Sequence, residues 1–199
     1  MPIQMQIYKS YFEFRKIAIC ICLFIAFSVQ AQELPPIQNF TSEDYGAQNQ
    51  NWSISQNLDK YIYIANNLGL LEYNGSKWEL YESPNRTVIR SVKAIEDRIY
   101  TGCYMEFGYW ERNILGSLEY TSLSQKLKLD LIEDEQFWNI IRLDDWILFQ
   151  SLNRIYIVNS QDLSINIIDS ETELTKMIEN NGTIYFQKKG KKSHIHTPK

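Results

Sequence analysis

The side chains of this chain that could do chemistry are mainly carboxylates, which gather in two short segments. Residues Glu133 to Glu135 and the pair Asp144 and Asp145 could supply oxygen ligands for a calcium ion or the two carboxylates of a glycoside hydrolase. Their spacing is not that of a calcium-binding loop, and Asp144 and Asp145 lie where a turn between strands is expected. We therefore interpret both segments as solvated loops and turns.

Histidine and cysteine, the usual residues of nucleophilic catalysis and transition-metal binding, are scarce in this sequence. The two histidines, His194 and His196, stand near the C-terminal end, so a Ser-His-Asp relay or a histidine-centred metal site has no histidine in the body of the chain. Cys20 and Cys22 belong to the N-terminal segment, which leaves Cys103 without a disulfide partner, and we interpret it as a small apolar side chain. The sequence predicts no catalytic residue, no cofactor and no bound metal, and therefore no enzyme.

The N-terminal segment has the pattern of a secretory signal peptide. Arg15 and Lys16 precede a run of about a dozen apolar residues, and the small residues of Val29 to Ala31 then supply a cleavage site. A membrane anchor is the alternative, but the run is shorter than the roughly 20 apolar residues that a spanning helix needs. We predict that residues 1–31 are a signal peptide and that the rest of the chain is exported.

The exported body is strongly acidic. Residues 32–187 hold 12 Lys and Arg against 23 Asp and Glu, a net charge of −11. Such a surface repels phosphate backbones, so direct contact with nucleic acid is excluded. Residues 188–199 hold five lysines and depart from the pattern of the body, and we predict an aberrant or disordered basic tail there.

The body is composed of short segments typical of β-strands. Residues 61–65, 70–73 and 77–81 are rich in β-branched and aromatic side chains and are separated by Asn, Asp and Gly turns. Residues 130–136 and 171–180 have helical leanings, and both segments are short. The fold class is therefore predicted to be all-β.

These strands recur in matched columns along the sequence. One column holds Ile62, Ile99, Ile147 and Ile184, at intervals of 37, 48 and 37 residues. A second column aligns residues 68–73 with 107–111, and a third begins each unit with Trp52, Arg90 and Trp138. A mean period near 40 is that of a four-stranded propeller blade. We predict a partial β-propeller in residues 32–187, with about three blades and one incomplete blade; a β-sandwich would explain the strands but not the columns.

Aromatic rings are numerous and could stack on sugar rings, but most of them fall inside the predicted strands. Trp78, Trp110 and Trp146 are of this kind, and we assign them to the core between blades. Ligand recognition is expected instead from strand ends, because loops on a rigid scaffold carry most binding residues. The predicted ligand-binding residues are Asn67, Tyr104, Glu106, Trp138 and Asn153.

Two segments carry a resemblance to a known family. Residues 63–75 resemble the two-component-regulator propeller repeat, in which an aromatic-aliphatic strand and a small turn precede Gly-Leu-aliphatic residues and an aromatic. Residues 98–110 resemble the propeller sensor of Bacteroidetes regulators that carry a triple-tyrosine domain, a membrane span and a LuxR-like helix-turn-helix. The resemblance covers residues 38–186. It implies a non-catalytic periplasmic sensor in signal transduction, which recognises an extracellular cue such as a glycan and regulates transcription across the membrane.

The resemblance is also incomplete. A full sensor of this family has many more blades, so we interpret the chain as a truncated sensor whose membrane link lies in the missing C-terminal part. Residues 38–45 are expected to form the outermost strand of a blade, and the free faces of the stack are expected to favour aggregation. The alternative is the propeller of a secreted polysaccharide-binding or polysaccharide-degrading protein.

Overall fold

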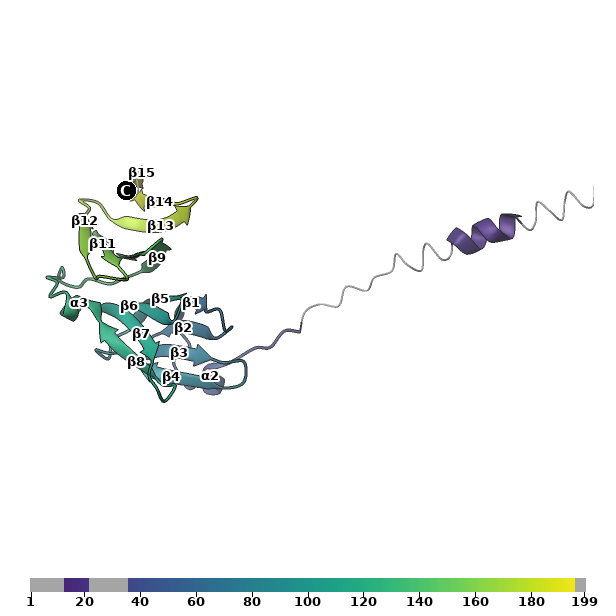
Figure 1. Ribbon diagram of the computed structural model, residues 1–199, viewed down its shortest axis with the longest axis horizontal. Coiled ribbons are helices and arrows are strands. Elements are labelled where there is room, and N and C mark those ends of the chain that lie inside the picture. Colours follow the sequence, from purple (N-terminus) through teal and green to yellow (C-terminus); the bar gives the residue numbers. More distant parts are fainter. Residues whose placement is uncertain (1–12, 22–35, 196–199) are drawn as a thin grey trace, which may run out of the picture. The chain divides into compact units, whose positions relative to one another are not determined.

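The computed structural model describes residues 13–21 and 36–195 (Figure 1). The chain divides into two compact units, residues 1–39 and 40–199. In the first unit, residues 13–21 are helical, and the cleavage site of the predicted signal peptide lies outside the described residues. Within the described part of the chain, no helix is long and apolar enough to cross a membrane.

The second unit consists of antiparallel sheets whose strands follow one another in chain order (Figure 1). The first blade contains β1 (Asn51–Gln56), β2 (Ile62–Asn66), β3 (Gly69–Tyr73) and β4 (Trp78–Glu82). The second contains β5 (Ile89–Ile95), β6 (Arg98–Cys103), β7 (Phe107–Arg112) and β8 (Leu118–Ser122). The third contains β9 (Asn139–Leu143), β10 (Trp146–Gln150), β11 (Arg154–Asn159) and β12 (Ile165–Asp169). A fourth, three-stranded sheet contains β13 (Leu174–Asn180), β14 (Thr183–Lys188) and β15 (Lys191–Ile195). The predicted all-β arrangement of four-stranded blades is confirmed.

Three hydrophobic cores hold successive sheets together. Tyr63 of β2 and Trp110 of β7 belong to the core between the first and second blades. Phe107 of β7 and Phe149 of β10 belong to the core between the second and third blades. A third core joins the third blade to the fourth sheet. Each blade therefore buries its apolar residues against its neighbours, which is how propeller blades are stabilised.

The first strands of successive sheets are also linked by hydrogen bonds between side chains and backbone. The Ala94 N–H of β5 donates to Ser55 Oγ of β1 at 2.9 Å. Ser91 Oγ of β5 donates to the Phe137 carbonyl at 2.8 Å, and Asn139 Nδ2 of β9 donates to the Met177 carbonyl of β13 at 2.7 Å. These links hold the first strands of successive sheets close together.

Several segments differ from the sequence-based expectation. Residues 38–45 do not form an outermost strand, because Ser42–Tyr45 form the short helix α2, where the Thr41 N–H donates to Asp44 Oδ2 at 2.6 Å. Phe40 and Tyr45 pack on Trp78 of β4, with ring centroids 5.3 and 5.7 Å apart. This segment therefore covers a face of the first blade instead of extending its sheet.

The C-terminal segment also differs from the expected disordered or aberrant tail. Lys191–Ile195 form β15, which pairs with β14 from Lys188 opposite Lys191 to Ile184 opposite Ile195. Strand pairing is made by main-chain groups, and lysines are common on sheet edges. The lysine-rich composition was therefore no obstacle to a strand.

Gly102 of β6 lies close against the segment that leads to the third blade. A Cβ at this position would lie 2.5 Å from Phe137 Cβ and 2.6 Å from Ser91 Oγ. We expect Gly102→Ala to lower the free energy of unfolding by about 1–3 kcal/mol, the usual cost of overpacking. Urea denaturation measures this loss; Ser76→Ala, at an exposed turn, should change it by less than about 0.5 kcal/mol. Equal stability of the two variants would contradict the close packing at Gly102.

Candidate functional site

All five predicted ligand-binding residues lie at the same end of the blades. Asn67 follows β2, Tyr104 and Glu106 follow β6, and Asn153 follows β10, so these four belong to equivalent turns between second and third strands. Trp138 precedes β9, and its backbone N–H donates to the Gln150 carbonyl at the end of β10 at 2.8 Å. In antiparallel sheets these turns lie beside the beginnings of the first strands.

Glu106 lies inside the protein and not on a binding surface. It is only 4% exposed, and its carboxylate accepts hydrogen bonds from the hydroxyls of Tyr120 at 3.1 Å, Ser122 at 2.9 Å and Ser124 at 2.8 Å. A buried carboxylate needs such donors to remain in the fold. Its geometry gives Glu106 an internal role in fixing the turn after β6 and the start of α3 (Leu123–Lys126).

Tyr104 and Asn153 are accessible, but they belong to separate local networks. The Tyr104 hydroxyl donates to Asp134, and the Tyr104 carbonyl accepts from Asn85 Nδ2 at 2.7 Å. Asn153 is exposed, and its carbonyl accepts from the Ser170 N–H at 2.8 Å. Both residues thus help to hold loops at this end of the blades.

Trp138 forms a cluster with two residues that were not predicted as ligands. The Arg90 guanidinium carbon lies 3.9 Å from the ring centroid of Trp52 and 4.8 Å from that of Trp138. The two indoles are 6.0 Å apart and nearly perpendicular, at 78°. Trp52 is 40% exposed and Trp138 37% exposed, so both residues are partly open to solvent. We call these three residues the tryptophan–arginine cluster.

The three residues of the cluster occupy equivalent positions in successive repeats, because they form the third matched column of the sequence. Trp52 and Arg90 occupy equivalent irregularities at the starts of β1 and β5, where the register shifts between Asn51 and Ser53 and between Ile89 and Ser91. Bulges of this kind redirect a side chain out of the normal alternation. The repeat column therefore identified these three positions, but it did not show where their side chains point.

Polar neighbours fix the orientation of the cluster. Trp52 Nε1 donates to Asn67 Oδ1 at 2.8 Å, and Asn67 Nδ2 donates to Gln48 Oε1 at 2.8 Å. Arg90 Nε donates to Gln136 Oε1 at 2.9 Å. Asn67 also lines a cavity of about 440 Å³ with Leu68, Leu80, Glu82 and Arg86. Two predicted residues, Asn67 and Trp138, are thus brought together at the cluster.

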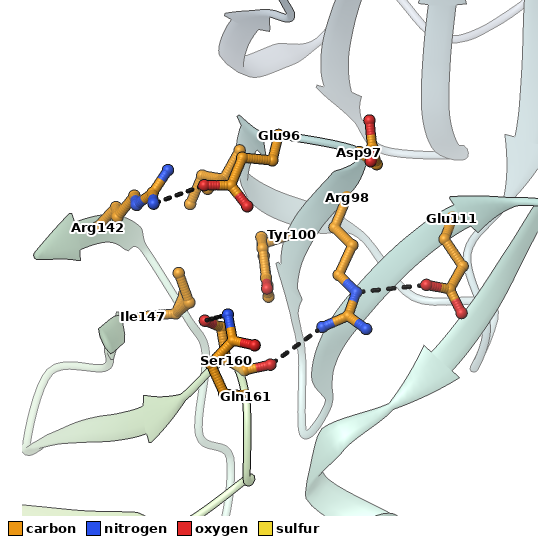
Figure 2. Close-up of a pocket in the computed structure, with 10 residues that line it drawn as sticks. Glu96, Asp97, Arg98, Tyr100, Glu111, Arg142, Ile147, Ser160 and Gln161 are labelled. Carbon is orange, nitrogen blue, oxygen red and sulfur yellow. Dashed lines mark hydrogen bonds and ion pairs between the residues drawn. The ribbon is translucent and has the colours of Figure 1, made fainter. Parts of the chain in front are cut away.

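A second pocket of about 350 Å³ lies at the opposite end, between the second and third blades (Figure 2). Arg98 Nε lies 3.3 Å from Glu111 Oε2, and Arg98 Nη1 donates to the Ser160 carbonyl at 3.3 Å. On the other side Arg142 Nη2 lies 2.6 Å from Glu96 Oε1. None of these residues was among those predicted from the sequence as ligands. Because both arginines already have carboxylate partners, this pocket is the weaker candidate.

The carboxylates and the thiol singled out in the sequence have structural roles. The expectation of a solvated Glu135 is wrong: it is 5% exposed and accepts from Tyr156 Oη at 2.7 Å and from Ser151 Oγ at 2.5 Å. Asp144 lies in an exposed turn, as expected. Burial raises the pKa of the Cys103 thiol to about 12, so it is protonated and a poor nucleophile. Among the described residues, no group of three His, Cys, Asp or Glu is arranged to hold a metal ion.

Comparison with known proteins establishes the fold. No family model and no curated protein matches the sequence. Similar solved structures include a domain described as the extracellular part of a hybrid two-component system, BT4673 of B. thetaiotaomicron, at 19% identity and a TM-score of 0.55. This chain is a set of β-propeller blades.

The similarity covers 69% of this chain and 19% of the BT4673 domain, so the chain spans about a fifth of that domain. A protein from Lactobacillus plantarum has 13% identity and a TM-score of 0.54 over 75% of this chain and 55% of its own. YCF48 from Cyanidioschyzon merolae has 12% identity and the same TM-score over 70% and 48%. At these identities the likeness establishes the shared propeller fold.

Proposed function

We propose that these blades are a non-catalytic, ligand-recognising part of an extracellular sensor propeller, and that the tryptophan–arginine cluster binds the cue. The regulator to which such a propeller belongs would relay the signal across the membrane to transcription. The fold supports this proposal, because it is shared with the extracellular domain of a two-component system. The resemblance of residues 63–75 and 98–110 to sensor propellers points in the same direction.

The single observation that carries the proposal is the exposure at one point of two tryptophans, one in β1 of the first blade and one just before β9 of the third. Large apolar rings are normally buried, and here hydrogen bonds and the Arg90 guanidinium hold two of them at the surface. An exposed indole offers an apolar face to the C–H face of a sugar ring, while neighbouring amides bind hydroxyls. A saccharide is therefore the ligand that this surface fits.

The proposal predicts that a saccharide changes the tryptophan fluorescence of the full chain. A panel of neutral and acidic oligosaccharides should contain at least one that binds, and Trp138→Ala should weaken its binding about tenfold or more, because central aromatic residues dominate such interfaces. The matched control is Trp146→Phe, at the opposite end of the third blade, which should leave the affinity unchanged. An unchanged affinity in Trp138→Ala, or no binding across the panel, would refute the proposal.

A further inference from the structure

Arg90 differs from the other strand arginines because it has no acidic partner. Within the described residues, four arginines form ion pairs with carboxylates at 2.6–3.3 Å, namely Arg98, Arg112, Arg142 and Arg154. Arg90 of β5 forms no such pair, although acidic residues outnumber basic ones in this body about two to one. Burial lowers the pKa of Arg90 and no carboxylate raises it, but a guanidinium stays charged at physiological pH. The cluster therefore holds an unbalanced positive charge.

The terminal nitrogens of Arg90 are left without protein acceptors. Its Nε is used by Gln136 Oε1, and its Nη1 is enclosed by the protein with no hydrogen-bond partner. Among the described residues no hydrogen bond from its Nη2 is found, and the Arg90 residue as a whole is partly exposed. Because Nη1 is enclosed, an incoming carboxylate would meet the guanidinium through Nη2, in a charge-assisted hydrogen bond. Such a carboxylate would approach beside the partly exposed Trp138 ring and supply the counter-charge that Arg90 lacks.

We infer that the ligand of the tryptophan–arginine cluster is an acidic saccharide, a uronate whose carboxylate pairs with the end of the Arg90 guanidinium while its ring stacks on an exposed indole. This inference rests on the proposed function and specifies its ligand. The two interactions suit one sugar unit, because a uronate carries its carboxylate at the edge of a ring with an apolar face. A neutral sugar would stack but leave Arg90 without a counter-charge.

The acidic body makes this inference easy to distinguish from non-specific attraction. Residues 32–187 carry a net charge of −11, which repels polyanions at a distance. A preference for an acidic over a neutral saccharide would therefore come from a local cation and not from the overall charge. Exposed charges more than a Debye length from the ligand, about 10 Å at 0.1 M salt, would contribute little to its binding free energy.

The test compares oligomers of galacturonate and of glucuronate with their methyl esters, which keep the sugar shape and lose the charge. We expect the full chain to bind one of the free acids at least tenfold more tightly than its ester, as measured by calorimetry or tryptophan fluorescence. Arg90→Gln should abolish the preference, and Arg90→Lys should retain part of it, since the charge remains without the planar fork. Lys93→Gln, which removes an exposed cation further along the same strand, should leave it intact.

The outcomes separate this inference from the proposed function. Equal binding of acid and ester, or binding of neutral sugars alone, would overturn the acidic-ligand inference and leave the sensor proposal standing. A preference that survives in Arg90→Gln would overturn the role of Arg90. Thermal unfolding of each variant shows whether a loss of binding comes from misfolding. If Arg90→Gln is misfolded, the preference for acid over ester is compared between the unchanged chain and Arg90→Lys, which keeps the charge. If no saccharide of either kind binds, the proposed function fails as well.

Discussion

Replacing Arg112 with methionine is expected to lower the free energy of unfolding by about 3 kcal/mol. Arg112, at the end of β7, reaches across to the first blade, where its Nη2 lies 2.6 Å from Glu72 Oε2 and 3.4 Å from the Tyr63 hydroxyl. The Glu72 side chain is only 5% exposed, whereas that of Arg112 is 34% exposed. Removing the arginine leaves a buried carboxylate without its counter-charge, which costs about 3–5 kcal/mol, and the partial exposure of Arg112 favours the lower value.

This loss should depend on pH in a defined direction. Burial raises the pKa of Glu72, and Arg112 opposes the rise, so the pKa will be higher still in Arg112→Met. Below the pKa of Glu72 in the unfolded chain, about 4.3, the carboxyl is neutral in both states and the penalty disappears. As the pH rises through the elevated pKa of the folded state, the penalty develops to its full size. The deficit should therefore be largest at neutral pH and shrink as the pH falls towards 4.

Urea denaturation at pH 7 and at pH 4.5 measures both effects. Adding Glu72→Gln to Arg112→Met removes the buried charge and should recover much of the loss at pH 7. Arg142→Met, which breaks an exposed pair with Glu96, is the matched control and should cost less than about 1 kcal/mol. A deficit of the same size at both pH values, or one no larger than that of the control, would show that the pair is not the source of the stability.

The fold was predictable because every blade repeats the same physical requirement. Each needs apolar residues in its second and third strands to pack against its neighbours, so the columns through Ile62, Ile99 and Ile147 carry the signal. The first strand of the fourth sheet was missed because Leu174 and Met177 are three residues apart, which resembles helical spacing. The register shift between Leu174 and Lys176 adds one residue, and both side chains are buried.

The candidate site was predictable only in part, because sequence gives the end of a blade but not the surroundings of a side chain. Trp138 and Asn67 were identified as strand-end residues, and both join the cluster. Glu106 was identified by the same reasoning, yet its hydroxyl donors lie 14–18 residues further along the chain, where no local pattern reveals them. Arg90 was visible in the repeat column, but its lack of a carboxylate partner is a property of the folded structure alone.

The core between the second and third blades should depend on Phe107 more than on any single surface contact. Phe107 is fully buried, and its ring centroid lies 4.4 Å from that of Phe149, 4.7 Å from Phe137 and 5.3 Å from Tyr156. These partners come from β10, from the segment before β9 and from β11. One ring therefore connects the second blade to three parts of the third.

We expect Phe107→Ala to lower the free energy of unfolding by about 3–5 kcal/mol, since it removes a large buried ring and leaves a cavity among rigid aromatic side chains. Phe107→Leu fills part of that cavity and should cost less. Ile114→Ala, at a fully exposed position, is the control and should change stability by less than about 0.5 kcal/mol. Urea titrations followed by circular dichroism give these differences. Because the lost contacts join two blades, a loss below about 1 kcal/mol in Phe107→Ala would mean that these blades do not share a packed core.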